Sequence, residues 1–324
     1  MKQKFTQSLS VIVTIGLGLA LTVYFYNSFT EGQKQQMKNY FVHADYNYVA
    51  ISLILATIGY VLRAYRWKYT LEQINCKPNF KLNFIAVSIG YFINLTVPRS
   101  GEVSRALILK KYQSQPFDKV FGTIIAERIV DFVILFSFIA IALLVEFDTL
   151  KAFLVANIPI AKLVWLAIIG FLLLIFGLYL YFYSKVPFVL VIKEKVQGLK
   201  EGAFSVTKIP HKWAFLGYTL LIWFSYILMF YCATFALDAT SQISIGTVLV
   251  AFVIGSLTIA FTNGGFGFFP VLIAKILLLY NIPFEAGTAF GWIIWISQLL
   301  ITVVLGLISF MVLPIIVRLK NVSH

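Results

Sequence analysis

Ionisable side chains inside long apolar stretches are the residues of this sequence best able to do chemistry. The apolar stretch 117–147 carries Glu127, Arg128 and Asp131. Residues three or four positions apart share one face of a helix, so these side chains are expected to lie together. Counted from Phe117, Glu127 lies roughly 15 Å along the helix, near the middle of a bilayer core about 30 Å thick. An ionised group there costs on the order of 3 kcal/mol, so each needs a charged partner or a water-filled cavity.

A second apolar stretch, 84–112, can supply those partners. It is interrupted at 97–102, and Arg99, Glu102 and Arg105 lie in or just after the interruption. The residues before the break form about 21 Å of helix, enough to bring the break to the membrane centre. The two stretches would then place three arginines beside three carboxylates. This set is formally neutral, which lowers the cost of burying each charge.

Such a cluster suits an anionic ligand. Guanidinium groups bind phosphate through paired hydrogen bonds, and the free backbone N–H groups of a helix N-terminus form an anion site. The segment 102–112 would point such an N-terminus at the membrane centre. The alternative is that the network only holds this segment against its neighbour, with Glu102 favourable in the first helical turn.

A third apolar stretch, 243–280, has a glycine-rich interruption. Gly264, Gly265 and Gly267 allow the backbone to approach a ligand closely, and Pro270 is tolerated in the first turn of the helix that follows. We expect this N-terminus to point at the membrane centre from the opposite side. The alternative is a packing hairpin without a ligand.

Three further basic residues, Arg63, Arg66 and Lys68, lie where the apolar stretch 48–69 is expected to meet the cytoplasm. We interpret them as anchors that fix the orientation of this helix, with contact to a lipid headgroup as the alternative.

The composition determines the class of protein. Of the 324 residues, 60% are hydrophobic and 12% are charged, whereas a soluble domain is about 25% charged. An integral membrane protein is indicated, and a cytosolic globule or a disordered chain is excluded. The net charge of +13 is interpreted as basic loops that face the cytoplasm rather than as nucleic-acid binding. Cys76 and Cys232 have neither metal-ligand nor disulfide-framework spacing.

The predicted fold class is an all-α polytopic membrane protein with six full transmembrane helices and two re-entrant helical hairpins, 84–112 and 243–280. With this arrangement one face carries 20 Lys and Arg and the other carries 4, which places both termini in the cytoplasm of a cell inner-membrane protein. The six full-length stretches are 9–29, 48–69, 117–147, 160–184, 212–237 and 284–317.

The two halves of the chain resemble each other. Pro116-Phe117-Asp118 and Pro283-Phe284-Glu285 open corresponding helices at an offset of 167 residues. We predict one membrane domain, 1–324, built from a first repeat (1–150) and a second repeat (151–324). Each repeat crosses three times, so the second copy is inverted, which is a recurrent plan of secondary transporters.

Four motifs stand in order along the chain: Arg66-Trp67, the run 90–105, Glu127-Arg128 with Asp131, and Gly264-Gly265-Phe266-Gly267. As a set they make the chain resemble the lysylphosphatidylglycerol synthase transmembrane-region family, also described as flippase-like membrane proteins. The resemblance covers nearly the whole chain and implies lipid translocation. Family members that also make the lipid carry a soluble aminoacyl-transferase domain after the membrane part, whereas this chain stops at His324, so we expect no synthase activity. Pro270 stands about where the family has an acidic residue after the glycine-rich motif. An arginine common on the family's last long helix is replaced near Trp295, and Gln298 lies opposite Asp131 in the alignment of the two repeats.

The leading hypothesis is a lipid transporter whose cavity between the repeats holds a phosphate on Arg99, Arg105 and Arg128. Glu102, Glu127 and Asp131 would balance those charges, and proton exchange on them is a further hypothesis. One alternative is a non-transporting partner of an envelope lipid or polysaccharide synthesis machine. The other is an intramembrane headgroup transferase with Glu127 or Asp131 as general base. We expect no enzyme activity and no cofactor, because the sequence has no phosphate-binding loop and its His residues form no metal pattern.

Overall fold

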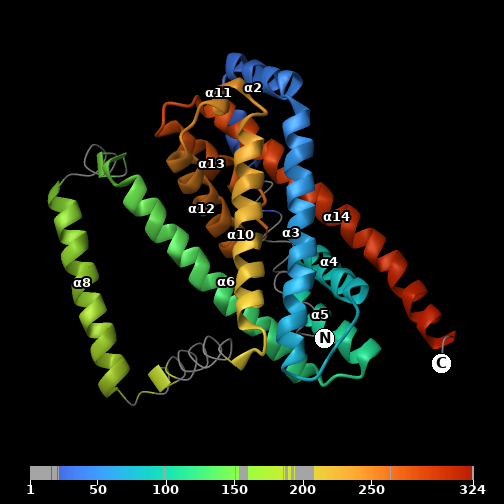
Figure 1. Cartoon of the computed structure of the whole chain (residues 1–324). Helices are drawn as coiled ribbons and strands as arrows, with labels where there is room; N and C mark the ends of the chain where they lie inside the picture. The colour runs from blue at the N-terminus through green and yellow to red at the C-terminus, as the bar shows by residue number, and fades with distance from the viewer. Residues whose placement is uncertain are drawn as a thin grey trace.

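The computed structural model shows a helical protein (Figure 1). It describes Gly16, Ala20, residues 22–97, 100–149, 151–152, 160–184, 186, 189–190, 193, 208–262 and 264–322. Within these ranges every regular element is a helix, as predicted. Four of the described helices are long and apolar enough to cross a membrane: α3 (Tyr46–Glu72), α6 (Phe117–Val145), α10 (Lys212–Thr234) and α14 (Phe284–Val322), the last over Phe284–Ile315.

The other two predicted crossings have different outcomes. The stretch 160–184 forms α8 (Ile160–Tyr183), which stands apart from the other helices in Figure 1. The stretch 9–29 lies largely outside the described residues. The total of six crossings therefore stays a prediction.

Both interrupted stretches form pairs of short helices. α4 (Phe80–Thr96) and α5 (Ser100–Gln113) flank the first break, and α12 (Ile245–Phe261) and α13 (Phe268–Leu278) flank the second. The side chains of Asn79 and Ser244 cap α4 and α12 by accepting hydrogen bonds from backbone N–H groups three residues on. These caps satisfy donors that a helix start otherwise leaves free.

The run of a long, two short and a long helix, α3 to α6, recurs as α10, α12, α13 and α14, with the single turn α11 between α10 and α12. α6 and α14 begin at Phe117 and Phe284, as the paired Pro-Phe-acid motifs predict. α3 packs along α10 at the centre of the molecule. In Figure 1 the α4–α5 pair lies at the lower end of this central pair and the α12–α13 pair lies toward the upper end. The two pairs of short helices thus occupy opposite ends of the bundle.

Two further helices were not predicted from the sequence. α2 (Glu31–His43) begins with a capping box, in which the Thr30 side chain accepts from the Gln33 backbone and the Gln33 side chain accepts from the Thr30 backbone. The Gln33 amide also donates to Glu285 at the start of α14. α11 (Asp238–Ser241) is a single turn. α2 and α11 lie together at the top of Figure 1.

Two apolar cores hold the bundle together. One combines side chains of α3, α4, α5 and α6, including the fully buried Trp67 and Leu109. The other combines α6, α10, α12, α13 and α14, with Phe230 packed edge-on against Phe290. α6 contributes to both cores, and it is the helix that carries the predicted charged residues.

The contact between α4 and α5 requires glycine at the crossing. A Cβ added to Gly101 would overlap the carbonyl oxygen of Gly90 and crowd the Asn94 amide. We therefore expect Gly101→Ala to separate the two helices and to destabilise the protein by about 1–3 kcal/mol. The matched control is Gly122→Ala on α6, where nothing lies within 4 Å of the added carbon. Thermal unfolding in detergent checks this, and equal unfolding temperatures for both variants would contradict it.

Candidate functional site

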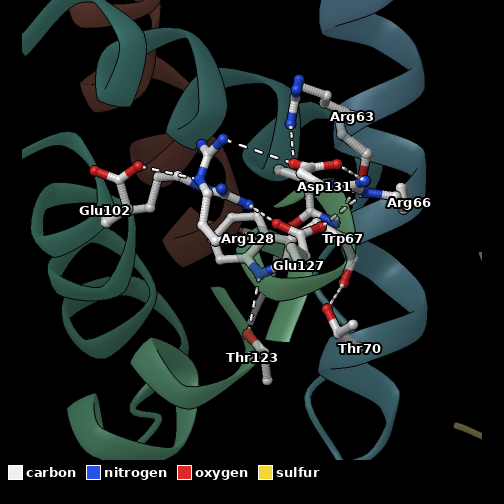
Figure 2. Close-up of polar contacts among 12 residues, drawn as sticks. Arg63, Arg66, Trp67, Thr70, Glu102, Thr123, Glu127, Arg128 and Asp131 are labelled. Atoms are coloured by element: carbon white, nitrogen blue, oxygen red, sulfur yellow. Dashed lines mark hydrogen bonds and ion pairs between the residues drawn. The ribbon is translucent and has the colours of Figure 1, made fainter. Parts of the chain in front are cut away.

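Asp131 is the centre of a buried network of ion pairs (Figure 2). Its Oδ1 lies 2.5 Å from Nη1 of Arg66, and its Oδ2 lies 3.0 Å from Nη2 of the same residue, so Arg66 binds it with both ends of the guanidinium. Arg63 Nη1 lies 3.0 Å from Oδ2, and Arg128 Nη1 lies 3.7 Å from it. One carboxylate on α6 thus faces three guanidinium groups.

Glu127 forms the second centre, one helical turn earlier on α6. Arg105 Nη2 lies 2.9 Å from Oε2 of Glu127, and Arg66 Nε lies 3.5 Å from Oε1. The Arg105 guanidinium stacks on the Trp67 ring with 4.0 Å between its central carbon and the ring centre. The Trp67 indole in turn donates to Thr123 over 3.1 Å. Glu127 is 2% exposed, so this part of the network is sealed from its surroundings.

Glu102 and Arg128 form the open edge of the network. Oε1 of Glu102 lies 3.1 Å from Nε of Arg128, and the two side chains are 18% and 33% exposed. Glu102 also accepts a hydrogen bond from the Asn94 amide, a long one of 3.4 Å. The Asn94 side-chain oxygen accepts from the Gly101 backbone over 2.7 Å, which ties α4 to the first turn of α5.

Arg63 connects this network to the second half of the chain. Its Nε donates to the hydroxyl of Tyr226 on α10 over 2.6 Å. Its guanidinium also lies over the Tyr226 and Tyr91 rings. The Arg66 side chain also donates a hydrogen bond to Thr219 of α10. The network therefore spans α3, α5 and α6 and contacts α10.

The charges do not balance. Arg63, Arg66, Arg105 and Arg128 face Glu102, Glu127 and Asp131, which leaves one positive charge in excess within the described part of the network. Among the described residues, Nε of the 5%-exposed Arg105 is also buried without a hydrogen-bond partner. An uncompensated buried cation is costly, and an anion placed beside it lowers that cost.

The predicted site residues of the first half that the structure describes all come together. Arg105, Arg128, Glu102, Glu127 and Asp131 all belong to the network. Arg99 lies outside the described residues.

The interpretation of Arg63 and Arg66 as topology anchors is wrong. Both are buried, at 8% and 0% exposed, and both pair with Asp131. Lys68 is 55% exposed at its side chain and lies 3.9 Å from Glu72, which fits a residue at the membrane surface. The spacing of the two arginines could have indicated a buried role. Arg63 and Arg66 are three positions apart and therefore share one helix face, just as Glu127 and Asp131, four positions apart, share a face of α6.

The predicted glycines of the second half form a separate structure. Gly264, Gly265 and Gly267 all have positive φ, a backbone conformation that only glycine adopts without strain. Gly267 precedes α13, so Pro270 falls in the first turn as predicted. The Gly264 carbonyl accepts from the Trp295 indole of α14 over 2.8 Å. A ligand at these glycines stays a prediction.

A crevice between α4, α5 and α6 reaches the open edge of the network. It has no room for a water molecule, so the structure is closed at this point. Its polar lining includes Asn94, Gly101, Glu102, Arg105 and Arg128.

Known proteins of three archaea resemble parts of this chain. A UPF0104 membrane protein of Methanocaldococcus jannaschii is 32% identical over 100 residues, which is 30% of each chain. One from Pyrococcus horikoshii is 28% identical over 138 residues, 41% of this chain and 40% of its own. One from Methanothermobacter thermautotrophicus is 27% identical over 132 residues, 40% of this chain and 37% of its own. The matches thus span less than half the length of these relatives.

No solved structure matches the chain. The sequence model of one family, described as the lysylphosphatidylglycerol synthase TM region, matches residues 9–306, which is nearly the whole chain. The motifs of that resemblance include Arg66 and Trp67 as well as the charged residues of α5 and α6, which are the residues of the network. The chain belongs to the lysylphosphatidylglycerol synthase transmembrane-region family.

Proposed function

We propose that this protein moves lipids with an anionic, phosphate-bearing headgroup between the two leaflets of the inner membrane. The observation that carries the proposal is the unbalanced network, in which three buried arginines and the partly exposed Arg128 face three carboxylates among the described residues. A lipid phosphodiester carries a single negative charge, which would neutralise the excess. Its acyl chains would stay in the bilayer while the headgroup passes along the protein.

Arg105 and Arg128 are the proposed phosphate ligands. Both line the crevice that meets the first turn of α5, where the helix start favours an anion. Arg128 is the more accessible of the two, and its loss leaves Asp131 paired with Arg63 and Arg66. Arg99, from the same break in the chain, is proposed as a third ligand.

The proposal includes the architecture predicted from the sequence. α4–α5 and α12–α13 are taken as two re-entrant hairpins that enter from opposite sides, within two repeats of inverted orientation. Their placement at opposite ends of the central pair α3–α10 supports this (Figure 1). Six crossings, with both termini in the cytoplasm, complete the arrangement. Alternating movement of the two repeats would expose the network first to one leaflet and then to the other.

The proposal assigns no catalytic step to the chain. Glu127 and Asp131 are the buried carboxylates suited to a general base, and both are held by arginines. A headgroup transferase therefore has less support than a transporter.

Mass spectrometry of the lipids that the purified protein retains in mild detergent tests the proposal. We expect the wild-type protein to enrich one anionic phospholipid class severalfold over its share of the membrane, and Arg128→Gln to lose that enrichment. Lys119→Gln removes an exposed charge from the same helix and should behave as wild type. The same bulk lipid in all three proteins would contradict the proposal and favour a non-transporting partner of an envelope-synthesis enzyme.

A further inference from the structure

The position of Glu102 has a consequence beyond charge balance. Its carboxylate lies in the first turn of α5, the helix that begins at Ser100. It faces Arg128 at 3.1 Å and accepts a hydrogen bond from the Asn94 amide. A helix start, a guanidinium and a side-chain amide are the groups that bind a phosphate. Here they surround a carboxylate of the protein itself.

The pair formed by Glu102 and Arg128 is also the least enclosed of the buried network. Its side chains are 18% and 33% exposed, whereas those of Arg105 and Glu127 are 6% and 3% exposed. An ion pair open to its surroundings is weaker than a sealed one, because competing groups can reach it. It is therefore the pair that an incoming anion would break first.

The crevice beside Glu102 also contains a hydrogen-bond donor that Glu102 does not use. Arg105 lines the same crevice, and its buried Nε has no hydrogen-bond partner among the described residues. Gly90 and Gly101 line the crevice beside it. A Cβ at Gly90 would press on the Arg105 side chain. The crevice, which Glu102 also lines, has no room for a water molecule.

We propose that the Glu102 carboxylate occupies, in this closed state, the place that a lipid phosphodiester takes on Arg128. Rotation of the Glu102 side chain away from Arg128 frees that guanidinium for the headgroup beside the unpaired Nε of Arg105, while Arg105 keeps its ion pair with Glu127. When no lipid is present the carboxylate returns and keeps the arginines paired. Glu102 thus competes with the substrate, and this role rests on the proposed function.

Competition makes a prediction that a purely structural role does not. Glu102→Gln removes one negative charge while keeping the size of the side chain, so the affinity for an anionic lipid should rise. We expect the Kd for short-chain phosphatidylglycerol to fall about tenfold, equivalent to about 1.4 kcal/mol. The Kd for phosphatidylcholine with the same acyl chains should fall by less, because its choline cation offsets the charge of its phosphodiester. Glu102→Asp, which withdraws the carboxylate by one methylene, should shift the phosphatidylglycerol Kd in the same direction by less.

The experiment titrates both lipids and inorganic phosphate into the full-length protein in detergent and compares wild type, Glu102→Gln, Glu102→Asp and Arg128→Gln. The Glu102 variants could bind phosphatidylglycerol no more tightly than wild type while Arg128→Gln loses binding. That result would contradict the proposed competition by Glu102 and still support a lipid site at Arg128. If no protein prefers phosphatidylglycerol over phosphatidylcholine, the proposed function fails as well. Tighter binding of inorganic phosphate than of phosphatidylglycerol would identify a free anion as the ligand and contradict the lipid.

Discussion

Replacement of Asp131 by asparagine is expected to destabilise the protein by about 3–5 kcal/mol, the typical cost of removing one partner from a buried ion pair. Three guanidinium groups lie within 3.7 Å of this carboxylate. Arg66 is fully buried and would keep Glu127, 3.5 Å away, as its acidic partner. Arg63 would keep its hydrogen bond to the Tyr226 hydroxyl, which carries no compensating charge. The variant therefore leaves excess positive charge in a site sealed by helices.

Thermal unfolding in detergent, followed by tryptophan fluorescence and size-exclusion chromatography, measures this effect. The matched control is Asp118→Asn, which removes an exposed carboxylate from the first turn of the same helix. That change should cost about 0.3–1 kcal/mol through the helix dipole. Similar unfolding temperatures for the two variants would show that the network is not what stabilises the contact between α3 and α6.

Features encoded by neighbouring residues could be predicted from the sequence. α6 and α14 begin directly after Pro116 and Pro283, because proline has no N–H and its fixed φ suits a helix start. α12 ends at Phe261 and α13 begins at Phe268, and the three glycines between them take positive φ, which a continuing helix does not allow. The pairing of Glu127 with Arg105 and of Arg128 with Glu102, across the first break, follows from depth and helix periodicity.

The partners on α3 could not be predicted in the same way. The apolar stretch was expected to end at residue 69, but the helix continues to Glu72. Arg63 therefore lies nine residues before the helix end, about 13 Å inside it rather than at its boundary. Its partner Asp131 is 68 positions away, and no local pattern specifies a contact over that distance. The packing of α3 on α6 determines this contact.

The polar helix α2 was missed for a different reason. Its sequence is too hydrophilic to register as a membrane element, and its described residues include none that is buried. The capping box of Thr30 and Gln33 was the available signal. By contrast, the apolar stretch 160–184 was correctly predicted to be helical.

Loss of the Arg128 guanidinium should have the largest effect on transport. In the proposed mechanism this group binds the headgroup phosphate, and a hydrogen bond to a charged group contributes about 1.5–3 kcal/mol. If the bond forms as the headgroup crosses, its removal slows transport by about 10- to 100-fold. Arg128→Lys keeps the charge but loses the two-pronged geometry, so an intermediate rate is expected. Asp131 keeps two arginines in both variants, so the fold should persist.

The most direct test is the rate at which fluorescently labelled phosphatidylglycerol changes leaflet in proteoliposomes, read from the fraction accessible to an external quencher. Wild type and the exposed-site control Lys119→Gln should exceed protein-free vesicles, with Arg128→Lys slower and Arg128→Gln close to the protein-free rate. Equal rates for wild-type and protein-free vesicles would contradict the account, and so would an Arg128→Gln variant that transports as fast as wild type.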